Sequence, residues 1–298
     1  MPMTPRPAAA AGNQGGEYAM VLGRTSGEYR RLRQQARLWE PATARVLDQA
    51  GVRPGMRCLD VGCGPGEVMR LLAGLVGPAG QVTGVDTDGR LGREMLAVLR
   101  GTLPGPDRFA FIEADAVAAD QIAGQPFDLV YARLLLSHLG DPVAMLRKLA
   151  AWTQPGGLLV VQDYDVRTAD MWPPLATWGE FERVVFGVYE HTGRDLRFGH
   201  KLPVHFRAAG LGEPDGTDVA GVVAPAAEVS WLYEGVYRSI LPAALRLGLT
   251  TEANSSAFLA EVTTAGRERS RAVLCPLLVS AWKRVGHQDQ AVSAGRPA

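Results

Sequence analysis

The sequence lacks long apolar runs and an excess of charge of either sign. No stretch approaches the ~18 consecutive apolar residues that a membrane helix needs, and the apolar run near the N-terminus is too short for a signal peptide. Lys and Arg together number 31, as do Asp and Glu, so the formal net charge is zero. Without a basic cluster the chain has no electrostatic footprint for DNA or RNA. We therefore expect a cytoplasmic protein whose partners include neither a membrane nor a nucleic acid.

Cysteine is also scarce. The three cysteines, Cys58, Cys63 and Cys275, are odd in number and show no C-x-x-C spacing. This pattern fits a reducing compartment and argues against both a disulfide framework and a zinc site. We interpret the three side chains as small packing residues and expect no metal.

The length of 298 residues fits one enlarged domain better than two small ones. Residues 1–15 are rich in Ala, Pro, Gly and Asn without apolar periodicity, which predicts a disordered tail. Residues 16–50 carry apolar side chains at helical spacing and predict a helical arm, in which Pro41 breaks or restarts the helix. A core over 51–168 and lid helices with the last strands over 169–298 complete the same domain.

Apolar runs typical of strands alternate with helical patterns through the core. The predicted strands are 58–61, 81–86, 109–115, 127–133 and 156–164, and the predicted helices are 67–76, 91–100 and 134–152. Beyond residue 165 we expect helices near 174–191 and 196–209, a strand near 217–224, two helices between 226 and 266, and a last strand near 271–283. Alternating strands and helices predict an α/β fold with a doubly wound, mostly parallel sheet.

A glycine-rich motif follows the first predicted strand. In LDVGCGPG the order D-x-G-x-G-x-G is formed by Asp60, Gly62, Gly64 and Gly66. Glycines are needed where the backbone turns sharply and approaches a ligand closely. Asp86 and Asp115 end the next two strands, and the carboxyl ends of parallel strands open on one crevice. We therefore expect the three carboxylates to face one pocket, with Asp86 suited to accept hydrogen bonds from both hydroxyls of a ribose.

The segment from about Arg53 to Asp163 resembles the class I S-adenosylmethionine-dependent methyltransferases. The family pattern VLDxGCGxG is matched by residues 58–66, its strand-end acids by Asp86 and Asp115, and its LxPGG turn by residues 152–157. The resemblance implies a Rossmann-like, seven-stranded fold that binds S-adenosylmethionine and releases S-adenosylhomocysteine. The residues that it places around this cofactor are Asp60, Gly62, Cys63, Gly64, Gly66, Asp86, Thr87, Asp115, Ala116, Arg133 and Leu134.

Two other classes share this sheet. An NAD(P)-dependent oxidoreductase would carry the fingerprint G-x-G-x-x-G, whereas this loop reads GCGPG with Asp60 in front of it. A protein that binds the methyl donor without catalysis is a third alternative, because function depends on the substrate site and not on the fold.

Methyl transfer from a sulfonium is an in-line displacement, so the enzyme aligns the acceptor and, for some acceptors, removes a proton. The candidates for this work are His138, Asp163 and Tyr164, which follow the fourth strand or end the fifth. His138 also has a purely structural interpretation, and the alternative for one of Asp163 and Tyr164 is a hydrogen bond to nearby backbone. Strand four ends in Tyr131-Ala132-Arg133, which does not supply the carboxylates of a metal-dependent relative.

The N-terminal segment resembles the helical arm of bacterial natural-product methyltransferases, including carbon-methylating enzymes of indole and prenyl compounds. By that resemblance Tyr18 reaches the active site, and Arg31 and Gln35 bind the methionine end of the methyl donor. The alternative is an amphipathic helix that packs on the sheet or on a second subunit, and we expect a homodimer or higher homo-oligomer through this arm.

Aromatic residues gather in the lid region and predict a pocket for a bulky apolar ligand. The residues that we expect to line this pocket are Trp172, Trp178, Phe181 and Trp231. The small-molecule acceptor is then hydrophobic and aromatic, and we expect carbon methylation of an indole-type metabolite in bacterial specialised metabolism. Methylation at oxygen or nitrogen of another small metabolite is the alternative.

Overall fold

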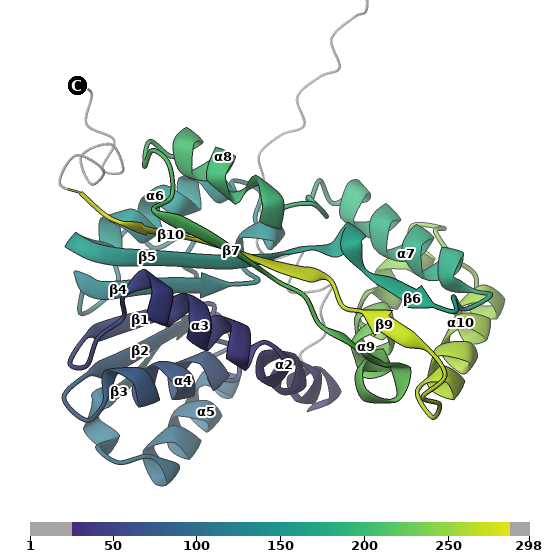
Figure 1. Ribbon diagram of the computed structural model, residues 1–298, viewed down its shortest axis with the longest axis horizontal. Coiled ribbons are helices and arrows are strands. Elements are labelled where there is room, and N and C mark those ends of the chain that lie inside the picture. The colour runs from purple at the N-terminus through teal and green to yellow at the C-terminus, as the bar shows by residue number, and fades with distance from the viewer. Residues whose placement is uncertain (1–25, 287–298) are drawn as a thin grey trace, which may run out of the picture.

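The structure is a computed structural model that describes residues 26–286 (Figure 1). Its centre is a seven-stranded sheet in the order β3-β2-β1-β4-β5-β10-β7. The strands are β1 (Arg57–Val61), β2 (Gln81–Asp86), β3 (Phe109–Glu113), β4 (Phe127–Arg133), β5 (Thr153–Asp165), β7 (Gly216–Ala220) and β10 (Leu277–Arg284). Strands β1 to β5 pair in parallel, whereas β10 runs antiparallel to both β5 and β7. The predicted mostly parallel seven-stranded α/β fold is confirmed.

Helices cover both faces of this sheet. Successive strand residues point to opposite faces, so Cys58 of β1 enters the core under one helix layer and Leu59 enters the core under the other. The first layer consists of α3 (Glu40–Ala50), α4 (Glu67–Val76) and α5 (Gly89–Thr102), and the second consists of α6 (Pro142–Trp152) and α8 (Leu202–Ala208). Between residues 26 and 286, short turns of 3-10 helix connect the elements at Pro106–Arg108, Leu136–His138, Val166–Thr168 and Gly199–Lys201. Because β1 lies between β2 and β4, the strand order reverses there and opens a crevice at the carboxyl ends.

The helical arm is divided at Trp39. Helix α2 (Ser26–Leu38) ends there, and Pro41 lies in the first turn of α3, where its missing N–H costs no hydrogen bond. Helix α2 reaches away from the sheet and packs against a lid helix, α9 (Ala226–Arg246). Gly235 of α9 makes this close approach feasible, because a Cβ there would lie 2.5 Å from Cδ of Arg31. The arm therefore joins the core to the lid. Tyr18 lies outside the described residues.

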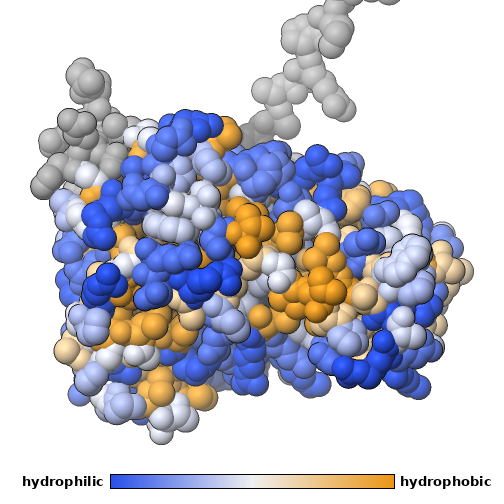
Figure 2. All heavy atoms as spheres, in the orientation of Figure 1, coloured by the Kyte–Doolittle hydropathy of each residue, from blue (hydrophilic) through white to orange (hydrophobic). Residues whose placement is uncertain are grey.

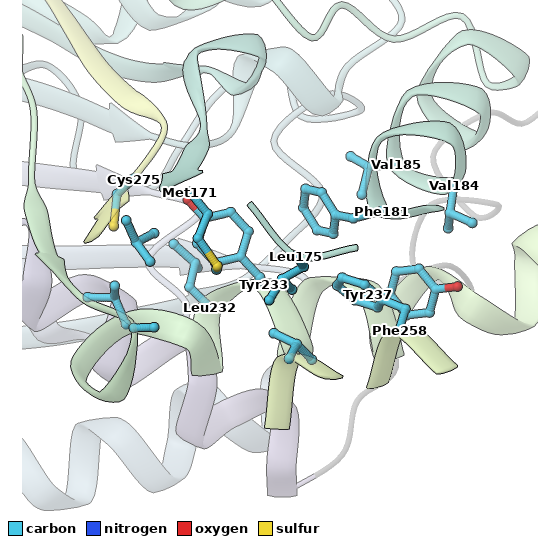
Figure 3. Close-up of a cluster of buried hydrophobic side chains, with 14 of the residues drawn as sticks. Met171, Leu175, Phe181, Val184, Val185, Leu232, Tyr233, Tyr237, Phe258 and Cys275 are labelled. Carbon is cyan, nitrogen blue, oxygen red and sulfur yellow. The ribbon is translucent and has the colours of Figure 1, made fainter. Parts of the chain in front are cut away.

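The lid is built from α7 (Trp178–His191), α9, α10 (Glu252–Ala265) and a small antiparallel sheet. This sheet has the order β6-β9-β8, with β6 (Asp170–Trp172), β8 (Val223–Pro225) and β9 (Ala272–Leu274). Figure 3 shows the apolar core of the lid, in which Phe181 and Val185 of α7 lie near Tyr233 of α9. The second sheet was not predicted: the expected strands near 217–224 and 271–283 are each divided in two, and the second sheet takes one part of each.

One predicted helix is wrong at its start. The sequence predicted a single helix over 134–152, but residues Leu136–His138 form a separate 3-10 turn and α6 begins only at Pro142. Asp141 sets this boundary because its side chain accepts a hydrogen bond from the N–H of Ala144 at 2.8 Å, which is the bond of a helix N-cap. His138 thus lies in a turn and not on a helix.

The face that Figure 2 shows is mainly hydrophilic, with hydrophobic residues gathered across its middle. Val219 of β7 and Val223 of β8 are among the exposed apolar side chains. Within residues 26–286, every helix is too short or too polar to cross a membrane.

Candidate active site

A cavity of about 850 Å³ lies at the carboxyl ends of β1, β2 and β4, between the sheet and the lid. Its walls come from α2, the glycine loop after β1, the ends of β2, β4 and β5, and the lid helices α7 and α9. A volume of this size is typical of a ligand pocket. It lies at the point of strand reversal where sheets of this kind bind their ligands.

The glycine loop forms one wall, but its glycines have different roles. Gly62 and Gly64 line the cavity together with Cys63. Gly66 does not line the cavity, which contradicts the prediction that it contacts the cofactor. A Cβ on Gly66 would lie 2.2 Å from Cγ of Met95, and its φ of +76° is unfavourable for other residues. Gly66 therefore allows α4 to start close against α5.

Asp86 fastens this loop to the end of β2. One carboxylate oxygen accepts the N–H of Gly64 at 2.9 Å, and the other accepts the N–H of Asp88 at 3.0 Å. Each oxygen keeps a further lone pair, and the carboxylate lines the cavity. Asp88 in turn caps α5 through the N–H of Leu91 and accepts the hydroxyl of Tyr29 at 2.5 Å. The carboxylate of Asp86 is thus fixed and still able to accept hydrogen bonds from a ligand.

Asp60 is the most unusual carboxylate of the site. Its side chain is 2% exposed and lines the cavity, and its Oδ2 atom makes no hydrogen bond with any residue of 26–286. Burial raises the pKa of Asp60 to about 7, while the charge of Arg133 lowers it and that of Asp86 raises it further. A buried carboxylate oxygen without a partner is costly. A cationic group in the cavity would supply the missing partner.

Arg133 is held at the end of β4 by a buried polar network. Its guanidinium donates to Thr43 Oγ1 at 3.0 Å, and Thr43 donates to Gln162 Oε1 at 2.8 Å. Gln162 Oε1 also accepts the hydroxyl of Tyr131. The next residue, Leu134, has a φ of 53°, a strained value for a leucine. Arg133 and Leu134 both line the cavity, so a fixed charge and a strained backbone meet there.

The remaining predicted cofactor residues also border the cavity. Thr87, Asp115 and Ala116 lie at its open rim, where Thr87 and Asp115 are exposed. Asp115 accepts the N–H of Val117 at 2.9 Å, which orients its carboxylate just beyond the end of β3.

Helix α2 contributes a buried ion pair. Arg31 donates two hydrogen bonds to Glu28 and one to Gln35, and all three side chains line the cavity. Glu28 is further fixed by the hydroxyl of Ser239 on α9, at 2.8 Å. The sequence prediction named Arg31 and Gln35 but missed Glu28, although its spacing of three residues from Arg31 on a helix was a usable signal.

The histidine and aspartate proposed for catalysis occupy different places. His138 lines the cavity, and burial, then the charges of Arg194 and Arg31, lower its pKa to about 3. Asp163 does not line the cavity, which contradicts the prediction that it acts directly in catalysis. Its carboxylate is fully buried and accepts bonds from the N–H and hydroxyl of Ser137 and from the N–H of Tyr164. Burial raises the pKa of Asp163 to about 6.

Tyr164 points to the other side of β5 from Asp163 and lines the cavity. Its hydroxyl oxygen accepts a hydrogen bond from Trp39 Nε1 at 2.5 Å, and the two rings meet edge to face with centroids 5.8 Å apart. Burial raises the pKa of Tyr164, so the hydroxyl stays protonated at neutral pH.

Of the four lid residues predicted to line the pocket, only Phe181 does so. Trp172 is 73% exposed at the edge of the small sheet, because β6 turns its side chain outward. Trp178 stacks on Phe181 from behind, with centroids 5.0 Å apart, and Trp231 donates to the carbonyl of Glu228 within α9. The predictions for these three tryptophans are wrong.

Further aliphatic and aromatic residues complete the lid wall. They are Val185, Val188 and Tyr189 of α7, and Leu232, Tyr233, Val236 and Ile240 of α9. With Phe181 they follow helical spacing on each helix, so periodicity indicates the aliphatic members of this wall, which aromatic content alone does not.

Comparison with known proteins identifies the chain's relatives. A family model described as a methyltransferase domain matches residues 29–211. A trans-aconitate 2-methyltransferase from Paracidovorax citrulli is 33% identical over 141 residues, which are 43% of this chain and 51% of that protein. A demethylmenaquinone methyltransferase from Staphylococcus aureus is 28% identical over 155 residues, 52% of this chain and 61% of that protein. The chain thus spans about half to three fifths of the length of these relatives.

Solved structures share the fold at low sequence identity. A Bacillus halodurans protein assigned as a methyltransferase superposes with a TM-score of 0.54 at 15% identity, over 82% of this chain and 98% of that one. A cyclopropane-fatty-acyl-phospholipid synthase-like protein from Lactobacillus casei gives a TM-score of 0.50 at 18% identity, over 89% and 97% of the two chains.

Proposed function

The chain belongs to the methyltransferase domain family, and we propose that its cavity binds S-adenosylmethionine and directs the methyl group to a hydrophobic, aromatic small molecule. The proposal depends chiefly on one observation. The same cavity has fixed carboxylates and glycines at the strand ends and an apolar wall on the lid side. A polar methyl donor and an apolar methyl acceptor that bind side by side require such a lining.

The sheet end of the cavity fits the donor. Asp60 offers a buried, unpartnered carboxylate oxygen to a cationic amino group, and the fixed guanidinium of Arg133 lies near it to pair with a carboxylate. Asp86 keeps free lone pairs for two ribose hydroxyls. These groups match the zwitterionic methionine part and the ribose of S-adenosylmethionine. When bound, S-adenosylmethionine supplies an electrophilic methyl group on a sulfonium.

The lid end fits an apolar acceptor. Val185, Val188, Leu232 and Ile240 offer no hydrogen bonds, so binding there depends on removing apolar surface from water. Phe181 and Tyr189 add aromatic faces from the same helix. The curated relatives are named for trans-aconitate and demethylmenaquinone, and these names support a small-molecule acceptor.

The state of His138 favours carbon methylation of an electron-rich ring. With its pKa lowered to about 3, the imidazole stays neutral at physiological pH and is too weak a base to deprotonate an alcohol. Attack by a ring carbon on the methyl group breaks the carbon–sulfur bond and leaves a ring cation that is strongly acidic. A weak base such as neutral His138 suffices to take that proton. An indole-type acceptor in specialised metabolism meets this requirement.

Product analysis tests this function. The protein is incubated with S-adenosylmethionine that carries a deuterated methyl group and with a panel of indoles, cyclic dipeptides and prenylated indoles. We expect a product in which the label is bound to carbon, identified by mass spectrometry and NMR. Label found only on oxygen or nitrogen would contradict carbon methylation, and labelling of no compound would contradict the acceptor class. The homo-oligomer predicted from the arm concerns a second copy of the chain and stays a prediction.

A further inference from the structure

The hydroxyl of Tyr164 differs from those of two other tyrosines that line the cavity. Tyr29 donates its proton to Asp88, and Tyr233 donates its proton to the carbonyl of Leu274 at 2.8 Å. Tyr164 instead accepts a hydrogen bond, from Trp39 Nε1. Among residues 26–286 no group accepts the Tyr164 proton, since this contact with Trp39 is the one hydrogen bond of its hydroxyl there.

Trp39 fixes the direction in which Tyr164 acts. An indole N–H can only donate, so the Tyr164 oxygen must use a lone pair toward it and its proton must point elsewhere. The Trp39 ring is fully buried in the core where the arm, the lid and the sheet meet, so it has little freedom to turn away. The nearest carboxylate along the strand, that of Asp163, points to the opposite face of β5 and is already bonded to Ser137. The cavity is the direction left for the proton.

The surroundings of this proton define its partner. Tyr164 lines the cavity, and the charges of Arg133 and Arg31 are near enough to its hydroxyl to lower its pKa against the effect of burial. Positive charge nearby strengthens donation to an electron-rich oxygen. The aliphatic lid residues Val185, Leu232 and Ile240 carry no donors that could satisfy the additional lone pairs of a carboxylate. A carbonyl oxygen, which only accepts, is the complementary group.

We propose that Tyr164, oriented by Trp39, donates a hydrogen bond to a carbonyl oxygen of the methyl acceptor, an inference that rests on the function proposed above. It narrows the acceptor class to aromatic compounds that carry a ketone or amide carbonyl. Tyr164 is then a recognition residue and not a base, and Trp39 is the residue that positions it.

A matched pair of probes tests this role. 3-Acetylindole and 3-ethylindole differ by a carbonyl in place of a methylene group, and each is titrated into the protein saturated with S-adenosylhomocysteine. The ratio of their affinities should fall about tenfold from the wild type to Tyr164→Phe, the change expected for the loss of one hydrogen bond. Trp39→Phe keeps the Tyr164 hydroxyl but removes the hydrogen bond that orients it. The ratio should therefore fall by a smaller factor than in Tyr164→Phe. Tyr237→Phe, a lid tyrosine bonded to Glu180 and outside the cavity, should leave the ratio unchanged.

Infrared spectroscopy gives a second measurement. The carbonyl stretch of bound 3-acetylindole should lie at lower frequency in the wild type than in Tyr164→Phe, because a hydrogen bond weakens the C=O bond. An equal ratio and an equal frequency in the two proteins would overturn the proposal, as would a wild type that binds neither probe with S-adenosylhomocysteine present. Failure of S-adenosylhomocysteine itself to bind would instead overturn the proposed function.

Discussion

Asp163 receives two hydrogen bonds from Ser137, one from the backbone N–H at 3.0 Å and one from the hydroxyl at 2.7 Å. These bonds tie the end of β5 to the short turn that follows β4, and His138 is the next residue in that turn. A carboxylate that does not line the cavity thus determines the position of an imidazole that does.

Removing the Asp163 carboxylate should destabilise the fold. In Asp163→Ala the buried N–H and hydroxyl of Ser137 lose their acceptor, and we expect the free energy of unfolding to fall by about 3 kcal/mol. Ser137→Ala keeps the carboxylate and one of the two bonds, and should cost only about 1 kcal/mol. Urea unfolding followed by circular dichroism measures both. Equal losses in the two variants would contradict this account of the turn.

His138 should make the protein sensitive to acid. The pKa of His138 is lowered to about 3 in the folded protein, whereas an unfolded histidine titrates near its ordinary value of 6.5. The unfolded state therefore binds a proton first as the pH falls, and stability present above about pH 6.5 is lost toward pH 3. Between pH 7.5 and pH 4.5, the free energy of unfolding of the wild type should fall by about 2 to 3 kcal/mol more than that of His138→Gln. A difference between the two proteins that does not change with pH would show that His138 titrates normally.

Gly66 should matter for folding more than for binding. In Gly66→Ala a left-handed backbone and a contact with Met95 combine, and we expect a loss of about 2 kcal/mol in the free energy of unfolding. Replacing Met95 with alanine as well should remove the contact, so the double variant should lose less than the sum of the two single changes. Thermal unfolding of the three variants tests this coupling. Strictly additive losses would mean that Met95 does not limit the space at Gly66.

Asp60 should make donor binding depend on pH. The pKa of Asp60 is raised to about 7, and only its charged form can pair with the amino group of S-adenosylmethionine. Affinity should therefore weaken as the pH falls, by about eightfold between pH 7.5 and pH 6. Asp60→Asn cannot titrate and should bind weakly at both pH values with a flat profile. An equally flat profile in the wild type would contradict the pairing of Asp60 with the amino group.

The glycine loop and the strand ends could be predicted because their residue types follow from local geometry. Asp60, Asp86 and Asp115 each end or follow a strand, and parallel strands necessarily bring those ends together. The lid could not be predicted in the same way. Whether an aromatic side chain faces a cavity depends on how separate helices pack, so Phe181 was placed correctly while Trp172 and Trp231 were not.

The role of Asp163 shows a second limit of the sequence. Its position at the end of β5 made it a candidate together with Tyr164, but the alternation of side chains along a strand places only Tyr164 at the cavity. The register of β5 against its neighbours decides between the two residues, and this register is a tertiary property.

The central claim is that the cavity binds S-adenosylmethionine through its strand-end carboxylates. Calorimetric titration of the wild type and Asp86→Ala with S-adenosylmethionine, S-adenosylhomocysteine, NAD and NADP tests it most directly. We expect binding of the first two ligands alone, weakened in Asp86→Ala by about 1.5 to 3 kcal/mol through the loss of hydrogen bonds to a charged group. Binding of NAD or NADP in place of S-adenosylmethionine, or an affinity for S-adenosylmethionine that is unchanged in Asp86→Ala, would contradict the account.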